Sequence, residues 1–201
     1  MQTTAQLVRT ATQELLTPAS PPTTLSPRFV DWLGLKTFGD TELEKAASAC
    51  QEWASAFKAK APPRWLSLIG ASGTGKTHCA KRLWRYAKQQ TDWQPFNYQP
   101  RAIFWPEFIQ ELRAGSAFDL RSELKRWPVL FLDDIGSERD PSGFAAEELN
   151  TLLGCRVGKW TLLTSNLDID GITAVDRRLS SRLIRDRNIC VSVKTKDFAT
   201  R

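Results

Sequence analysis

Apolar and polar positions follow two patterns along this chain, a helical spacing and short unbroken apolar runs. From Asp40 to Lys60 the apolar residues recur at steps of three and four: Leu43, Ala46, Ala47, Cys50, Trp53, Ala54 and Phe57. This spacing predicts a helix with one apolar face, and Asp40 or Thr41 can cap its first turn. The segment Ala-Pro-Pro at 61–63 ends the helix, and the apolar run 65–69 predicts a short buried strand.

The same alternation of strand and helix continues to residue 193. We expect helix 76–90, strand 101–105, helices 106–114 and 119–126, strand 129–132, helix 144–153, strand 160–164, an arginine-rich helix 174–185 and strand 189–193. Five short apolar strands alternating with helices predict an α/β fold, a five-stranded parallel sheet with helices on both faces. Residues 1–28 hold four prolines among Ser and Thr, which predicts a flexible tail or linker before one domain, 29–201.

Composition narrows the class of protein. The 201 residues carry 28 Lys and Arg against 22 Asp and Glu, a net charge of +6, and 41% of them are hydrophobic. These values are ordinary for a globular protein and exclude disorder throughout. Because no apolar run approaches the roughly 20 residues that cross a bilayer, and no signal-peptide core is present, we expect a cytoplasmic protein without membrane contact. Four scattered cysteines and one histidine predict neither a disulfide framework nor a zinc site.

The segment 70–77, GASGTGKT, follows the first core strand and opens the next helix. It matches GxxxxGK[ST] in the strand-then-helix context that this motif requires. Its glycines let successive backbone N–H groups turn toward phosphate oxygens, at the positive end of the helix. Lys76 is placed to neutralise the β- and γ-phosphates, and Thr77 to offer its hydroxyl to Mg²⁺. The sequence therefore predicts a site for ATP and Mg²⁺.

Polar side chains also follow two later strands. Asp133 and Asp134 come directly after strand 129–132, and Asn166 stands two residues past strand 160–164. Ligands bind at the carboxyl ends of the strands in α/β sheets. We therefore expect Asp133 to hold Mg²⁺, Asp134 to polarise the attacking water and Asn166 to orient it. Taken alone, an Asp pair could cap a helix and an Asn could form a turn; the phosphate-binding loop upstream favours the catalytic interpretation.

Residues 176–187 form a third polar segment, with five arginines and two aspartates. Val175, Leu179 and Leu183 fall on one face of the expected helix, so the arginines project towards its flanks. On its own this pattern indicates only a solvated basic helix.

With these segments in order, the sequence resembles the AAA+ ATPases of the DnaC/IstB-like group, bacterial and phage helicase loaders and transposition helper ATPases. The resemblance covers about residues 29–201 and rests on GASGTGKTHCA, VLFLDDIGSER, LNTLLGCRVGKWTLLTSNL and RRLSSRLIRDRNICVSV. It implies an AAA+ P-loop NTPase core. Since nothing follows the last strand, the resemblance further implies a core without the helical lid that many AAA+ proteins carry.

Matched residue by residue, the resemblance implies a complete set of site residues. It assigns Mg²⁺ to Thr77 and Asp133, catalysis to Asp134 and Asn166, and to Arg182 the arginine finger that acts on a neighbouring subunit's ATP. Nucleotide binding falls to Gly70, Ser72, Gly73, Thr74, Gly75, Lys76, Thr77 and His78. Hydrolysis then requires a homo-oligomer. Many AAA+ proteins have Glu where Asp134 stands, so we expect slow hydrolysis that DNA or a partner stimulates.

The implied function is that of a DNA replication accessory factor, a DnaC-like loader of a DnaB-like replicative helicase that oligomerises on single-stranded DNA. Candidate DNA contacts are Arg113, Arg121, Lys125 and Arg126, because the matching region lines the central channel in related initiators and loaders. A solvated charged face is the equally ordinary interpretation of these four residues. The same residues also fit an IstB-like helper whose partner is a transposase.

Two hypotheses from other classes remain. A P-loop kinase would close an arginine-rich helix over its own nucleotide, but it must exclude water, whereas the Asp pair and Asn166 serve water activation. A non-hydrolysing adaptor would use ATP only to organise an interface, although all the hydrolytic positions are filled.

Overall fold

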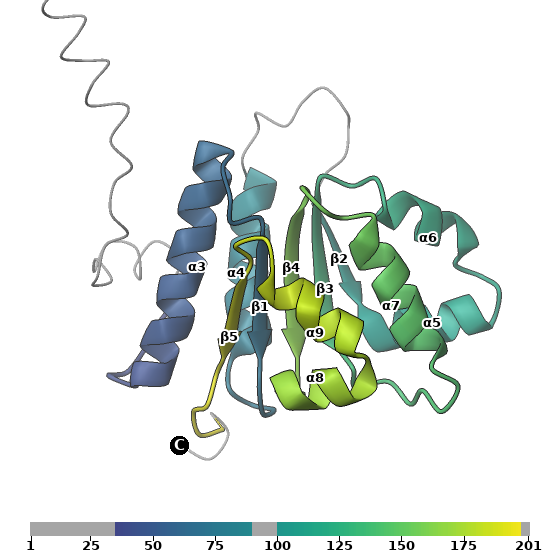
Figure 1. Ribbon diagram of the computed structural model, residues 1–201. Helices are drawn as coiled ribbons and strands as arrows, with labels where there is room; N and C mark the ends of the chain where they lie inside the picture. Colours follow the sequence, from purple (N-terminus) through teal and green to yellow (C-terminus); the bar gives the residue numbers. More distant parts are fainter. Residues whose placement is uncertain (1–34, 90–99, 198–201) are drawn as a thin grey trace, which may run out of the picture.

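The computed structural model describes residues 35–89 and 100–197, so the predicted tail 1–28 lies outside the described residues. The helices and strands follow the predicted alternation (Figure 1). In chain order they are α3 (Thr41–Ala59), β1 (Trp65–Ile69), α4 (Lys76–Gln89), β2 (Arg101–Phe104), α5 (Trp105–Arg113), α6 (Phe118–Leu124), β3 (Val129–Ile135), α7 (Phe144–Gly154), β4 (Trp160–Ser165), α8 (Ile169–Val175), α9 (Arg177–Ile184) and β5 (Ile189–Ser192).

The five strands form one parallel sheet in the order β2-β3-β4-β1-β5, which confirms the predicted sheet. Neighbours in the sheet are far apart in sequence, because each crossover carries at least one helix. All strands point the same way, so their carboxyl ends share one edge. That edge is where the predicted site residues come together. Among the described residues, which end at 197, no helix follows β5.

Helices cover both faces of the sheet, and strand side chains alternate between two apolar layers. Leu66 and Leu68 of β1 pack in the layer under α3 and α4, whereas Trp65 and Ile69 pack in the layer under α5 to α9. Figure 1 shows the first pair of helices on one side of the sheet and α5, α6 and α7 beyond its β2 and β3 end. The described helices include none long and apolar enough to cross a membrane.

The prediction of one continuous arginine-rich helix over 174–185 is wrong, because the structure divides this region into α8 and α9. Asp176 stands between them with extended backbone (φ −162°), and its side chain accepts from the backbone N–H of Arg178 as the cap of α9. Val175 therefore ends α8 and is 49% exposed, while Leu179 and Leu183 of α9 are buried. Asp is a strong cap residue, and here its capping outweighs the helical spacing.

A charged side chain lies deep in the core. Arg156, just after α7, is fully buried, and its guanidinium donates to Thr161 Oγ1, to the carbonyls of Leu124 and Trp127, and to that of Trp160 at 2.7–2.9 Å. Burial lowers the pKa of Arg156 to about 9. Its acceptors lie at the end of α6 and the starts of β3 and β4, so one side chain ties these three segments together.

Candidate nucleotide site

A cavity of about 730 Å³ lies at the carboxyl ends of the strands. It is lined by the loop after β1, by Asp133, Asp134 and Asn166 from β3 and β4, and by Leu35 to Phe38, Leu43 and Ala47 on the other side. Its size falls in the range of small-ligand pockets, roughly 300–1,000 Å³. One wall is polar and the other apolar, as a triphosphate and a base require.

The loop 70–77 has the backbone of a phosphate-binding loop. Gly70 (φ +120°) and Gly73 (φ +75°) lie in the left-handed region that favours glycine. A Cβ on Gly70 would stand 2.8 Å from the carbonyl oxygen of Val193, and one on Gly73 would stand 2.1 Å from the carboxyl carbon of Asp197. A side chain at Gly70 would therefore displace the backbone that follows β5, and one at Gly73 would require the Asp197 side chain to move.

Lys76, the first residue of α4, is held within the loop. Its Nζ donates to the carbonyl of Ala71 at 2.5 Å and to Thr74 Oγ1 at 3.3 Å. Burial lowers the pKa of Lys76, while the nearby Asp134 and Asp133 act in the opposite direction. A partly desolvated ammonium between a phosphate-binding loop and two carboxylates is well placed to donate to a phosphate oxygen.

Thr77 and Asp133 lie together, as the prediction requires. The hydroxyl of Thr77 donates to Asp133 Oδ1 at 2.8 Å, and the hydroxyl of Thr164 donates to the same oxygen at 2.6 Å. A hydroxyl beside a carboxylate at the mouth of the phosphate loop is a set of hard oxygen donors, which fits Mg²⁺ bound with a nucleotide. Thr164 orients this carboxylate and was not singled out from the sequence.

Asp134 and Asn166 form the second pair. Asn166 Nδ2 donates to Asp134 Oδ1 at 2.5 Å, and the backbone N–H of Asp134 donates to Thr164 Oγ1 at 2.9 Å. Asp134 has φ +63°, where the β3–β4 pairing shifts register between Leu132 and Ile135. Left-handed backbone at a non-glycine residue is strained and often marks a functional site. The irregularity turns the Asp134 side chain toward Asn166 and into the cavity wall.

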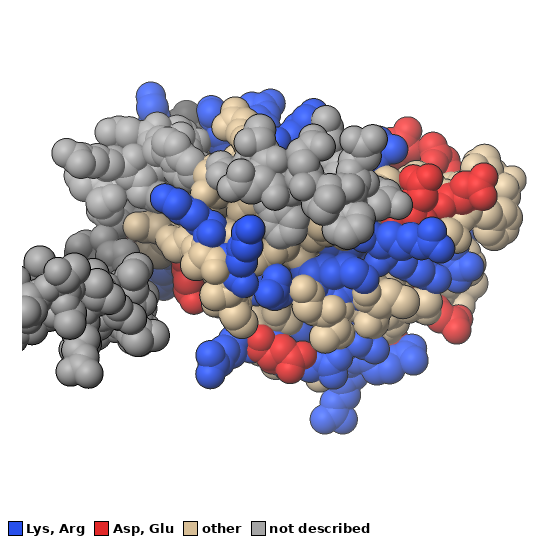
Figure 2. Space-filling model, turned by 90° about the horizontal axis from the view of Figure 1, so that it is seen from above, with Lys and Arg blue, Asp and Glu red and all other residues tan. Residues whose placement is uncertain are grey.

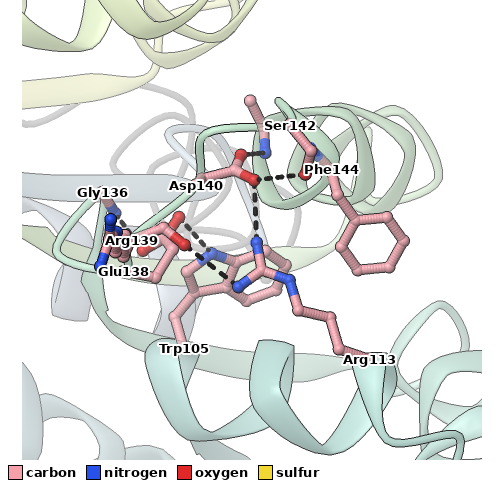
Figure 3. Close-up of polar contacts among 9 residues, drawn as sticks. Trp105, Arg113, Gly136, Glu138, Arg139, Asp140, Ser142 and Phe144 are labelled. Atoms are coloured by element: carbon pink, nitrogen blue, oxygen red, sulfur yellow. Dashed lines mark hydrogen bonds and ion pairs between the residues drawn. The ribbon is translucent and has the colours of Figure 1, made fainter.

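The loop after β3 is fixed to α5 by a polar cluster that sequence reasoning did not assign (Figure 3). Glu138 accepts from Trp105 Nε1 at 3.1 Å and from the backbone N–H of Gly136 at 2.9 Å. Burial raises the pKa of Glu138, and these two hydrogen bonds oppose the rise.

A second part of the cluster joins α5 to the same loop. Arg113 pairs with Asp140 at 2.9 Å and donates to the carbonyl of Arg139. Through Gly136, this cluster fixes the backbone two residues beyond Asp134.

We expect Glu138→Ala to lower the free energy of unfolding by about 1–3 kcal/mol, because it leaves the buried Trp105 N–H without its acceptor. The turnover number should also fall, with KM unchanged, since Asp134 loses its support. Denaturant unfolding and steady-state ATPase kinetics measure both effects. Glu111→Ala, an exposed change on α5, is the matched control and should alter neither quantity. Equal behaviour of the two variants would show that the cluster does not support Asp134.

Arg182 lies away from this cavity. It lines a second, smaller cavity of about 170 Å³ with Arg64 and Arg185, beside Trp65 and Gly158. Its guanidinium lies beside Gly154: the nearest guanidinium nitrogen is 3.5 Å from the position that a Cβ on Gly154 would occupy. Within one chain the structure therefore does not bring Arg182 to Lys76 or Asp134.

The four candidate DNA contacts differ from one another. Arg113 is paired with Asp140, and Arg121 makes a two-pronged ion pair with Glu148 at 2.6 and 2.7 Å. Lys125 is half-buried, and Arg126 is exposed. Of the predicted nucleotide contacts, Ser72, Gly73, Thr74, Gly75 and His78 line the cavity with Lys76 and Thr77, whereas Gly70 lies beneath the loop against Val193.

The sequence prediction missed the apolar wall of the cavity. Leu35 and Leu43 are buried, Phe38 is 69% exposed at the rim, and Phe104 at the end of β2 is 49% exposed. Leu43 was expected as part of the apolar helix face, and that same face continues into the cavity. Residues 35–38 were placed within the domain, but nothing in their spacing predicted that they line the nucleotide cavity.

Comparisons with known proteins identify the family and the fold. The family model of the bacterial DnaA ATPase domain matches residues 37–189. The chromosomal replication initiator protein DnaA of Francisella tularensis subsp. novicida is 26% identical over 137 residues, 68% of this chain and 28% of that protein. A replication initiator DnaA bound to AMPPCP and single-stranded DNA superposes with a TM-score of 0.63 at 20% identity, over 86% of this chain and 51% of that one. The DnaC helicase loader superposes with a TM-score of 0.63 at 20% identity, over 84% of this chain and all of that one.

The fold and the phosphate-binding loop define an AAA+ P-loop ATPase domain. The chain belongs to the bacterial DnaA ATPase domain family. It spans 28% of the length of the curated initiator and about half of the initiator structure. The likeness to helicase loaders predicted from the sequence is confirmed for the fold, since the DnaC loader shares it along its whole length.

Proposed function

We propose that this protein is an ATP-hydrolysing accessory factor of DNA replication, a DnaC-like loader of a DnaB-like replicative helicase that assembles on single-stranded DNA. One observation carries the proposal. The chain brings Lys76, Thr77, Asp133, Asp134 and Asn166 to one cavity, while Arg182 lines another surface. An arginine finger so placed can complete only a neighbouring subunit's site, so hydrolysis depends on assembly.

The residues divide the chemistry among them. Lys76 and the loop N–H groups bind and orient the triphosphate, and Arg182 of a neighbour stabilises the charge that develops on the γ-phosphate. Thr77 and Asp133 would hold Mg²⁺, which neutralises phosphate charge when bound. Asp134 accepts a proton from the attacking water, and Asn166 holds the Asp134 carboxylate and orients that water. Hydrolysis then removes the γ-phosphate that contacts Arg182 of the neighbouring subunit, and the contact between the two subunits loosens.

DNA binding through α5 and α6 is part of this proposal. Arg126 is exposed and can meet a phosphate directly. Arg113 and Arg121 would first have to exchange Asp140 and Glu148 for phosphates, so their contacts would form only with a rearrangement of the loop after β3 and of α7.

The kinase hypothesis is disfavoured by the position of α9. A kinase needs an arginine-bearing lid over its own nucleotide, and Arg182 and Arg185 line the smaller cavity instead. The pairing of Asp134 with Asn166 also suits activation of water, which a kinase must exclude.

The proposal is tested by ATP hydrolysis with and without single-stranded DNA and a DnaB-like helicase, at two salt concentrations. We expect DNA or helicase to raise the rate, and the DNA effect to weaken steeply with salt because phosphate contacts release counterions. Lys76→Ala should remove all activity. A rate that neither DNA nor helicase changes would contradict the loader assignment, and a response to a transposase instead would indicate the helper of transposition.

A further inference from the structure

A Lys or Arg stands at the start of each of the five parallel strands or within three residues before it. Arg101 is the first residue of β2, and Arg64 and Lys159 directly precede β1 and β4. Arg126 stands three residues before β3, and Arg187 two residues before β5. We call these five residues the strand-start row.

The strand order and register place the row across one end of the sheet. Arg101 pairs with Leu130, Leu130 with Thr161, and Thr161 with Trp65, so the strands start at the same level. From one edge of the sheet to the other the order is Arg101, Arg126, Lys159, Arg64 and Arg187. Neighbouring strands are 4.7–4.9 Å apart, so the row spans about 19 Å. Figure 2 shows this end of the molecule, with a band of Lys and Arg side chains across it.

Buried groups fix three side chains of the row. The Arg64 guanidinium lies 4.9 Å from the centre of the Trp160 ring, and that of Arg101 lies 4.7 Å from the Trp127 ring. Both indoles are nearly inaccessible to solvent, at 1% and 4% exposed. Lys159 Nζ donates to the carbonyls of Lys125 and Cys155, each at 2.8 Å. These cations are therefore oriented by contacts that leave their charge uncompensated.

Within residues 35–89 and 100–197, no ion pair includes a member of the row. The ion pair nearest to it in sequence joins Arg185 to Asp186 at 3.4 Å. By contrast, Arg113, Arg121 and Arg178 elsewhere on the protein all have carboxylate partners. A band of cations without carboxylate partners across one end of the sheet is complementary to a polyanion.

We propose that the strand-start row binds the phosphodiester backbone of a single nucleic-acid strand. Four of its five members are arginines, whose planar guanidinium matches phosphate geometry. The site lies at the opposite end of the sheet from the nucleotide cavity of the same chain, and its member Arg64 lines the smaller cavity with Arg182. Because the indoles beneath Arg64 and Arg101 are buried, bases cannot stack on them, and binding is independent of base sequence. The inference rests on the proposed binding of single-stranded DNA and extends that surface from α5 and α6, through the shared Arg126, across the end of the sheet.

The test compares two triple variants with the same loss of charge. Arg101→Gln/Arg126→Gln/Arg187→Gln removes the three exposed members of the row, and Lys45→Gln/Lys81→Gln/Arg139→Gln removes three exposed cations from other parts of the molecule. Fluorescence anisotropy of a labelled oligothymidylate measures affinity across a salt series, with and without a non-hydrolysable ATP analogue. ATP hydrolysis without DNA is measured on both variants to show that the nucleotide site is intact.

We expect the row variant to bind roughly 50-fold more weakly at low salt, with a salt slope lower by about 2, because each phosphate contact contributes about 0.7 for single strands. The control variant should change affinity less than threefold. If both variants bind DNA like the wild type, the row does not contact DNA, whereas the proposed binding of DNA by the protein stands. If the wild type binds polyglutamate but no DNA, the row takes an acidic polypeptide, and the proposed DNA binding fails with it.

Discussion

Replacing Asp134 with Asn is expected to slow ATP hydrolysis by about 10²–10⁴-fold, the contribution of a positioned general base. Asn keeps the size of the side chain but cannot take a proton from water. The backbone should hold, because Asn tolerates the left-handed conformation that Asp134 adopts at φ +63°. Thr164 Oγ1 still accepts from the backbone N–H at this position, so the end of β3 keeps its shape.

Single-turnover hydrolysis and binding of a fluorescent ATP analogue separate the two effects of Asp134→Asn. Affinity for ATP should stay within about twofold, because Lys76 and the loop bind the phosphates. Asp170→Asn, an exposed change in α8, is the control for loss of one carboxylate and should leave the rate unchanged. Hydrolysis at the wild-type rate in Asp134→Asn would remove Asp134 from the catalytic set.

Arg182→Ala should slow hydrolysis by about 10³-fold at least, the lower range for an arginine finger, and leave ATP affinity unchanged. The reason is its position in a second cavity, remote from the nucleotide of its own chain. Arg178→Ala on the same helix is the control, because Arg178 is exposed and paired with Asp176. Weakened ATP binding with a normal rate constant would mean that Arg182 acts within its own subunit.

The sheet and the nucleotide cavity could be predicted because their signals are local. Short apolar runs mark the strands, and the segment 70–77 carries its phosphate-binding geometry in consecutive residues. Parallel strands then bring Asp133, Asp134 and Asn166 to one edge without further information.

The features that sequence reasoning missed depend on contacts between distant segments. Thr164 supports both aspartates from 30 residues away, and Trp105 meets Glu138 across 33 residues. Arg156 carries no periodic signal, since a charged residue after a helix is ordinarily solvated, yet it is fully buried among carbonyls. The break at Asp176 was visible as a cap residue, but apolar spacing across it indicated one helix.

Mixing Lys76→Ala with Arg182→Ala tests the shared site most directly. Each variant alone should hydrolyse almost no ATP. In a mixed assembly, an Arg182→Ala subunit keeps an intact nucleotide loop, and a neighbouring Lys76→Ala subunit supplies the arginine. We predict that the mixture recovers part of the wild-type, DNA-stimulated rate, in proportion to the interfaces that pair the two. Two inactive variants that stay inactive when mixed, although both still assemble on DNA, would contradict a site shared between neighbouring subunits.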